Sequence, residues 1–132
     1  MKKLIVCVVL AVVSANAGKL SEDELANLRG SCTELEDKSA CQKLIKNGLT
    51  SVEKCGKDEC SEIGGIYSTA ENFQQALKYY VKACELGNFW GCSWAADLYK
   101  QGLGVKKDEA TAKKYYGKAC ELGNEDACKL SK

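Results

Sequence analysis

The chain has 132 residues, with 19 basic and 18 acidic side chains, no histidine and no proline. This near balance argues against a nucleic-acid-binding protein, which needs a distinct basic surface, so we expect no nucleic-acid partner. Without histidine the chain lacks the usual general base of hydrolytic enzymes and the common ligands of catalytic zinc, so we expect neither a metal nor a cofactor.

The first 17 residues have the pattern of a secretory signal peptide. Lysines at positions 2–3 precede an apolar run over residues 4–13, and residues 15–17 read Ala-Asn-Ala, a typical cleavage site. The run is shorter than the roughly 20 apolar residues of a membrane span, so we expect no membrane anchor. The sequence therefore predicts a secreted or periplasmic protein that begins at Gly18 and has a net charge of 17 − 18 = −1.

Cysteines are the next feature, because an exported chain can oxidise them. An even number at this density predicts a disulfide framework, although eight cysteines allow 105 pairings. The absence of histidine and of any Cys-x-x-Cys pair excludes a zinc knuckle and a thioredoxin-type site. Pairing between close neighbours is the simplest hypothesis, and it is least certain for the first four. The cysteines that remain after cleavage are Cys32, Cys41, Cys55, Cys60, Cys84, Cys92, Cys120 and Cys128.

Helix signals in the first half of the mature chain are irregular. Ser21-x-x-Glu24 is a capping box that opens a helix, and residues 39–46 form its return helix, ended by Asn47-Gly48. Residues 59–68 match a later helix by the spacing of Cys60 and a tyrosine. These signals predict an irregular hairpin over residues 18–48 and a degenerate repeat over 49–71.

The second half contains a repeat. Residues 76–92 recur at 112–128, and a fixed period of 36 residues indicates a stacked helical array. Asn72 and Asp108 precede the two copies and can cap their helices, and glycines at 87 and 123 can end them. A second helix is expected over residues 91–100, with Phe89 and Trp90 at the hairpin tip. The repeats are placed at 72–107 and 108–132, within a single domain over 18–132.

The sequence thus predicts an all-α fold, an α/α solenoid of helical hairpins stapled by disulfides. The string Ala-x-x-Tyr-Tyr-x-Lys-Ala-Cys-Glu-Leu-Gly-Asn-x-x-x-Cys at 76–92 resembles the Sel-one-like repeat, a relative of the tetratricopeptide repeat. Cysteines inside the motif make it similar to the Helicobacter cysteine-rich proteins. The resemblance implies a disulfide across the two helices of each unit, export, and a role in binding. It also implies penicillin binding or β-lactamase activity, the alternative function.

A serine β-lactamase needs a serine followed three residues later by lysine, and Ser51 and Lys54 fit that pattern. One such match is expected by chance in a lysine-rich chain. The chain has no Lys-Thr-Gly or Ser-Asp-Asn motif to complete the site. These two residues are therefore weak catalytic candidates, and the catalytic residues, if any, are unknown.

For a binding module, the candidate residues are aromatic and basic. Trp94 follows Trp90 by four residues, so the two tryptophans share a helix face beside Phe89 and can anchor a partner or pack on the N-terminal hairpin. Lys78 and Lys82 form a basic stripe that is repeated at 114 and 118 and that can also be a solvated face. We expect a monomer that binds a protein or peptide, with a penicillin-type β-lactam as the small-molecule possibility.

Overall fold

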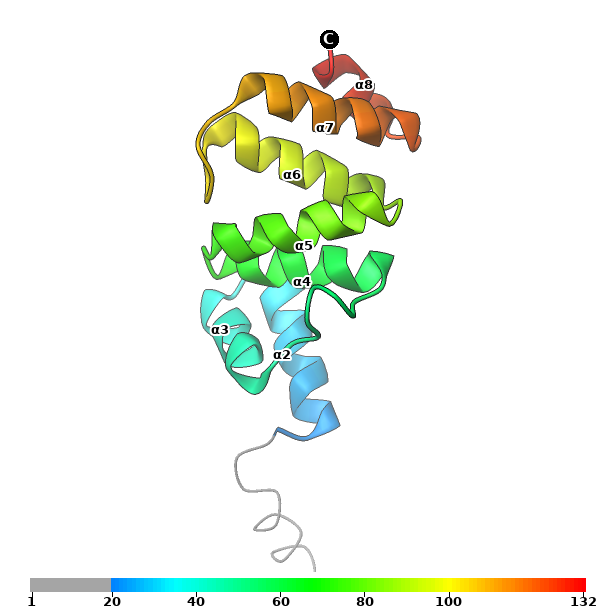
Figure 1. The fold of residues 1–132 in the computed structure, drawn as a ribbon. Helices are drawn as coiled ribbons and strands as arrows, with labels where there is room; N and C mark the ends of the chain where they lie inside the picture. Colours follow the sequence, from blue (N-terminus) through cyan, green and yellow to red (C-terminus); the bar gives the residue numbers. More distant parts are fainter. Residues whose placement is uncertain (1–19) are drawn as a thin grey trace, which may run out of the picture.

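The computed structural model describes residues 20–132, so the predicted signal peptide lies outside the described residues. The described part of the chain contains helices and no strand, as predicted (Figure 1). The helices stack in chain order, with α2 at one end of the array and α8 at the other. Their bounds are α2 Glu22–Glu34, α3 Lys38–Asn47, α4 Lys57–Thr69, α5 Phe73–Glu85, α6 Phe89–Gln101, α7 Glu109–Glu121 and α8 Glu125–Leu130.

Short polar side chains begin the helices at the predicted places. The Ser21 hydroxyl accepts a hydrogen bond from the Glu24 amide, and the Glu24 carboxylate accepts from the Ser21 amide, which lowers the pKa of Glu24. Asn72 caps α5 by accepting from the Gln75 amide. Asp108 caps α7, where the hydroxyl and amide of Thr111 donate to its carboxylate and lower its pKa. The predicted caps are confirmed.

One helix boundary differs from the prediction in a way that matters for the binding candidates. The helix expected over residues 91–100 begins at Phe89, because the Asn88 side chain accepts a hydrogen bond from the Gly91 amide and caps α6. Phe89 and Trp90 therefore lie in the first turn of α6, and their placement at a hairpin tip was wrong. The preceding Gly87 has φ 96°, the left-handed conformation that ends α5.

The four disulfides join the close neighbours, as the spacing predicted. Their Cα–Cα distances lie between 4.6 and 5.2 Å, within the usual bridging range. Three of them close the turn between consecutive helices, and the fourth joins the end of the loop before α4 to the first turn of α4. The pairs are Cys32–Cys41, Cys55–Cys60, Cys84–Cys92 and Cys120–Cys128.

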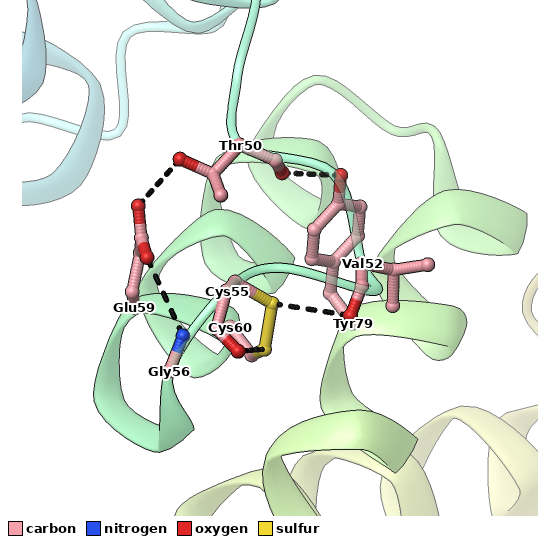
Figure 2. The surroundings of a disulfide bond; sticks show 7 residues. All are labelled: Thr50, Val52, Cys55, Gly56, Glu59, Cys60 and Tyr79. Atoms are coloured by element: carbon pink, nitrogen blue, oxygen red, sulfur yellow. Dashed lines mark hydrogen bonds between the residues drawn. A yellow bond between two sulfur atoms is a disulfide. The ribbon is translucent and has the colours of Figure 1, made fainter.

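Side-chain hydrogen bonds attach the long loop before α4 to the rest of the array (Figure 2). The Tyr79 hydroxyl donates to the Thr50 carbonyl at 2.8 Å. The Thr50 hydroxyl donates to the Glu59 carboxylate at 2.6 Å, and the same carboxylate accepts from the Gly56 amide at the start of α4. The loop is therefore held to α4 and α5 by both a disulfide and polar contacts.

Small residues let neighbouring helices approach closely. A Cβ atom added at Gly64 would lie 2.5 Å from the ring of Tyr80, and one at Gly91 would lie 2.7 Å from the Ala83 side chain. The buried side chains surround these contacts as a series of small clusters between neighbouring helices. The two alanines of α6 and three of the four repeated tyrosines are buried, namely Ala95, Ala96, Tyr79, Tyr80 and Tyr116, whereas Tyr115 is half-buried.

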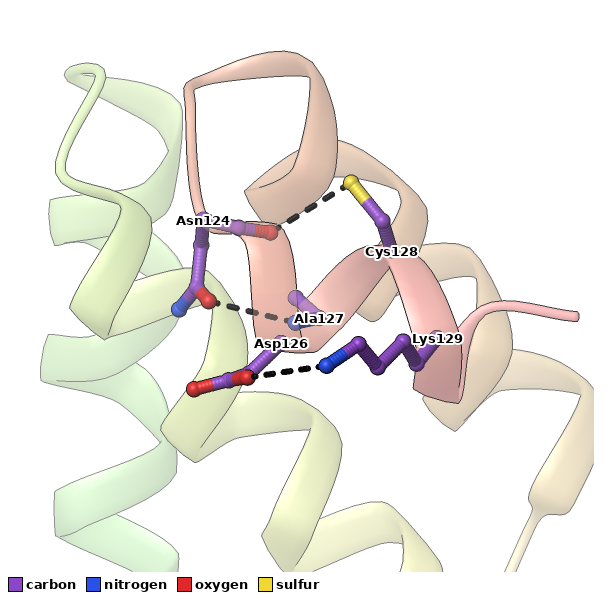
Figure 3. Close-up of polar contacts among 5 residues, drawn as sticks. All are labelled: Asn124, Asp126, Ala127, Cys128 and Lys129. Carbon is purple, nitrogen blue, oxygen red and sulfur yellow. Dashed lines mark hydrogen bonds and ion pairs between the residues drawn. The ribbon is translucent and has the colours of Figure 1, made fainter.

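Helices α6 and α8 are each tied to the helix two positions earlier in the chain by the asparagine that precedes them. Asn124 caps α8 by accepting from the Ala127 amide at 3.1 Å (Figure 3), while its amide group donates to the Ser93 hydroxyl on α6. The same figure shows the ion pair between Asp126 and Lys129 on α8. Asn88 has the same two roles, because it caps α6 and donates to the Asp58 carboxylate on α4. Over residues 20–132, no helix is both long and apolar enough to cross a membrane.

Candidate functional site

A groove of about 350 Å³ runs between α2, α4 and α6. Most of its wall is α4, whose residues face it at helical spacing, and Thr33 of α2 and Trp94 of α6 complete the two sides. Clefts of this size between helices are where small ligands and peptide side chains bind. The residues that line the groove are Thr33, Asp58, Ser61, Glu62, Gly65, Thr69, Asn88 and Trp94.

An aromatic ladder leads from the surface beside this groove into the core. Trp90 is 51% exposed and stacks on Trp94 with ring centroids 5.7 Å apart. Trp94, 37% exposed, in turn contacts the buried ring of Tyr80 at 5.3 Å. Phe89 adds a tilted contact to Trp90 at 5.1 Å. Burial raises the pKa of Tyr80 to about 12, so the inner end of the ladder is neutral at physiological pH.

The packing partner of the tryptophans is Tyr80 of α5, and from the predicted N-terminal hairpin only Thr33 lines the groove with Trp94. Trp94 is supported from below by Tyr80 and forms one side of the groove, whereas half of the Trp90 surface is open to solvent. Holding large indole rings partly exposed costs hydration free energy unless a partner covers them. The pair therefore remains the leading binding candidate.

Sequence reasoning missed the groove residues of α4. Cys60 and Cys92 are 32 residues apart, as are Ser61 and Ser93 and the tyrosines at 67 and 99. At the same offset, Asp58 and Glu62 of α4 correspond to Trp90 and Trp94 of α6.

At this offset Cys60 matches Cys92 and the buried Ile66 matches the buried Leu98 in side-chain type, whereas two exposed carboxylates of the groove correspond to exposed indoles. Aligning the sequences of α4 and α6 at this offset would have identified the groove positions before the structure was known. Since packing restricts exposed positions least, the exchange of carboxylates for indoles at exposed positions is what a surface adapted to a ligand would show.

The lysine candidates lie on a different surface. Lys78, exposed, and Lys82, half-buried, line a shallow depression of about 400 Å³ with the stacked rings of Tyr99 and Tyr115. The Lys118 ammonium lies 5.1 Å from the centre of the Tyr115 ring. None of these residues lines the groove. The structure thus separates the predicted aromatic and basic binding residues into two surfaces.

Ser51 and Lys54 lie in the turn before α4, and neither lines either depression, although Val52 between them lines the one with Lys78 and Lys82. Ser51 is exposed, and its backbone carbonyl accepts hydrogen bonds from the amides of Lys54 and Cys55. The pKa of Glu53 is lowered by a hydrogen bond from its own backbone amide and by one from the Ser51 side chain. The described contacts of Ser51 are those of a turn, and β-lactamase activity remains a prediction from resemblance.

Metal binding has no candidate site within the described residues. No group of three or more histidine, cysteine, aspartate or glutamate side chains is placed to hold an ion there. The eight cysteines of residues 20–132 are all in disulfides, which removes their thiolates as ligands.

Comparison with known protein families gives matches to the Sel1 repeat at residues 56–88 and 91–124, about half of the chain. The chain belongs to the Sel1 repeat family. With the repeat boundaries of the family, one repeat contains α4 and α5 and the next contains α6 and α7. The disulfide Cys84–Cys92 therefore joins successive Sel1 repeats. The repeats predicted at 72–107 and 108–132 are divided differently: each contains two helices joined by a disulfide, α5 with α6 and α7 with α8.

A solved structure, the cysteine rich protein B of Helicobacter pylori, is similar over most of both chains. The TM-score is 0.53 at 28% identity, and the match covers 86% of this chain and 98% of that one. The resemblance to the cysteine-rich Sel1 repeat proteins, and with it the stapled solenoid fold, is confirmed.

Two curated relatives are similar over a shorter stretch. Cytochrome c oxidase assembly factor 7 of Xenopus tropicalis is 36% identical over 59 residues, and cytochrome c oxidase assembly factor 7A of Xenopus laevis is 34% identical over 59 residues. The matches cover 41% and 45% of this chain. The chain spans about a quarter of the length of these relatives, because each match covers 26% of the relative.

Proposed function

We propose that this Sel1 repeat protein is an exported, monomeric interaction scaffold that binds a peptide or protein partner in the groove between α4 and α6. The observation that carries the proposal is the exposed indole pair, Trp90 and Trp94, at the edge of a groove in an otherwise well-packed helical array. Partly exposed tryptophans beside a concave surface are frequent binding hot spots. Repeat arrays in general present such surfaces to partners.

Two further observations support this role. Four disulfides in a chain of this size are typical of proteins that work in an oxidising compartment. Two relatives carry the name of an assembly factor, a role that depends on contacts with other proteins. The first observation supports export, and the second supports a role in binding.

The test is site-directed cross-linking in cells that produce the protein. A photoreactive amino acid at Thr69, in the groove, should capture a partner, whereas the same group at Lys113, exposed on α7, should not. The double variant Trp90→Ala, Trp94→Ala should lose the cross-link while keeping the helical circular dichroism spectrum. Equal capture from both positions would place the partner elsewhere and contradict the proposal.

Penicillin-type β-lactams are the small-molecule alternative that the family resemblance implies. Ring opening by the oxidised protein, measured beside a Ser51→Ala variant, separates this alternative from a scaffold. Hydrolysis that is lost in the variant would make Ser51 catalytic. We expect no ring opening by either protein.

A further inference from the structure

The groove carries negative charge without a compensating positive charge. Its lining includes the carboxylates of Asp58 and Glu62 and no lysine or arginine. Within residues 20–132 the ion pairs are Lys38–Glu71 and Lys129–Asp126, so Glu62 is in none of them. The Asn88 amide donates to Asp58 and fixes that carboxylate at the end of the groove. A ligand that enters the groove meets an acidic wall.

The opposite side of the groove suits a cation as well. An indole face attracts cations more strongly than other aromatic rings do. Among the described residues, the cation that lies over an aromatic ring is Lys118, over Tyr115. In that part of the chain, neither the Trp90 ring nor the Trp94 ring has a cation over it. Since Trp94 and Glu62 line the same groove from α6 and α4, a positively charged side chain between them contacts a ring and a carboxylate at once.

We propose that the groove binds a basic segment of the partner, with an arginine side chain held between Trp94 and Glu62. This inference rests on the proposed function and names the chemistry of its ligand. Arginine suits the site better than lysine, because its planar guanidinium stacks on an indole while its edge pairs with a carboxylate. The basic depression with Lys78 and Lys82 would repel the same segment, which favours the groove as its docking site.

The test titrates the oxidised protein with three sets of capped ten-residue peptides. All have a Ser, Gly and Leu background, and they carry two arginines, two glutamates or no charge. The chain has two tryptophans, and both belong to the ladder beside the groove, so intrinsic fluorescence reports on occupancy directly. We expect the arginine peptides to bind most tightly, with an affinity that falls as salt is raised.

Variants then identify the groups responsible. Glu62→Gln should weaken binding of the arginine peptides about 5- to 20-fold, because a charge-assisted hydrogen bond is lost. Glu62→Lys should reverse the preference towards the glutamate peptides. Glu109→Gln, an equally exposed carboxylate away from the groove, is the matched control and should leave the affinity unchanged.

Gly65→Leu provides a blocking variant that leaves the ladder intact. A Cβ atom at Gly65 would have only the Tyr80 hydroxyl within 4 Å, at 3.9 Å, so a longer side chain extends into the groove instead of the core. It should abolish peptide binding while the protein stays folded. Retained binding of the arginine peptides in this variant would overturn the inference.

Failure of the inference is distinguishable from failure of the proposed function. If neutral or acidic peptides bind as tightly and Gly65→Leu blocks them, the groove is a binding site but the basic ligand is wrong. If no peptide binds while Thr69 still captures a partner, the basic-segment inference is overturned and the scaffold stands. If neither assay shows binding, both proposals are overturned.

Discussion

Helices α4 and α6 are the same structural unit used for two purposes. Both begin near a disulfide, at Cys60 and Cys92, and both carry a small residue against α5, at Gly64 and Gly91. Towards the groove they differ, since α4 presents carboxylates and α6 presents indoles. The difference shows that a repeat can keep its packing positions while its exposed positions acquire opposite chemistry. Stability and recognition should therefore be separable by mutation.

The largest expected effect breaks the packing that the two helices share. Replacing Cys84 and Cys92 by alanine should lower the free energy of unfolding by about 2.5 kcal/mol, because the unfolded chain regains the entropy of an open loop. The Cys55, Cys60 pair closes a shorter loop and should cost about 2 kcal/mol. Urea unfolding of both variants measures the difference. If removing only one of the two disulfides lowers the free energy of unfolding, the two helices do not depend equally on their disulfides for stability.

A second prediction concerns Tyr80, the α5 residue that contacts both helices. Its pKa is raised to about 12 by burial, so the folded protein keeps the phenol proton more firmly than the unfolded chain does. Stability from this group is full below about pH 10 and falls as the pH rises from 10 to 12, by about 2 kcal/mol in total.

Urea unfolding at a series of alkaline pH values measures how steeply the free energy of unfolding falls with pH. Tyr80→Phe is the control, and it should have a flatter dependence than the wild-type protein. Similar profiles for the two proteins would contradict the burial of this hydroxyl.

Neighbouring glycines of α4 sharpen the contrast between a packing position and a groove position. Gly64→Ala places a methyl group 2.5 Å from the Tyr80 ring and should destabilise the protein by about 1.5 kcal/mol after the gain in helix propensity. Gly65→Ala makes only an ordinary contact, with the Tyr80 hydroxyl at 3.9 Å, and should stabilise it by about 0.5 kcal/mol. Thermal unfolding of the two variants measures both changes in stability, the loss at Gly64 and the gain at Gly65. A cost of equal size at Gly65 would mean that the groove face is packed.

The smallest expected loss of stability comes from transferring the chemistry of α4 onto α6. The double variant Trp90→Asp, Trp94→Glu copies the groove positions of α4 and should cost about 1 kcal/mol, mainly from the lost contact between Trp94 and Tyr80. Binding of arginine peptides should fall much further than stability does. Unfolding of the variant at 25 °C would show that the ladder is part of the core.

Local sequence signals were sufficient for the architecture. Caps such as Asn72, glycine turns and the 36-residue period each act within a few residues of one helix, so they could be interpreted one at a time. The pairing of all four disulfides followed from their spacing. The start of α6 was placed two residues late because Asn88, whose side chain caps this helix, was not recognised as its cap.

The groove required information that no single segment contains. Glu62, Gly65 and Thr33 meet Trp94 only after α2, α4 and α6 are stacked, and the sequence does not state which faces the stacking leaves open. The tryptophans were recognised because their spacing of four residues puts two large aromatic side chains on one helix face. Their acidic counterparts look like ordinary solvated carboxylates until the two helices are aligned at an offset of 32 residues.

The asparagine at the start of α6 and its counterpart before α8 suggest how such arrays can change in length. Each carries the capping group of its own helix and the hydrogen bond to the preceding layer in one side chain. A segment copied from one asparagine to the next would therefore bring its own connector with it. Tandem duplication in this phase gives an insertion that docks without new mutations, and it lengthens the groove by one helix whose exposed positions are free to diverge.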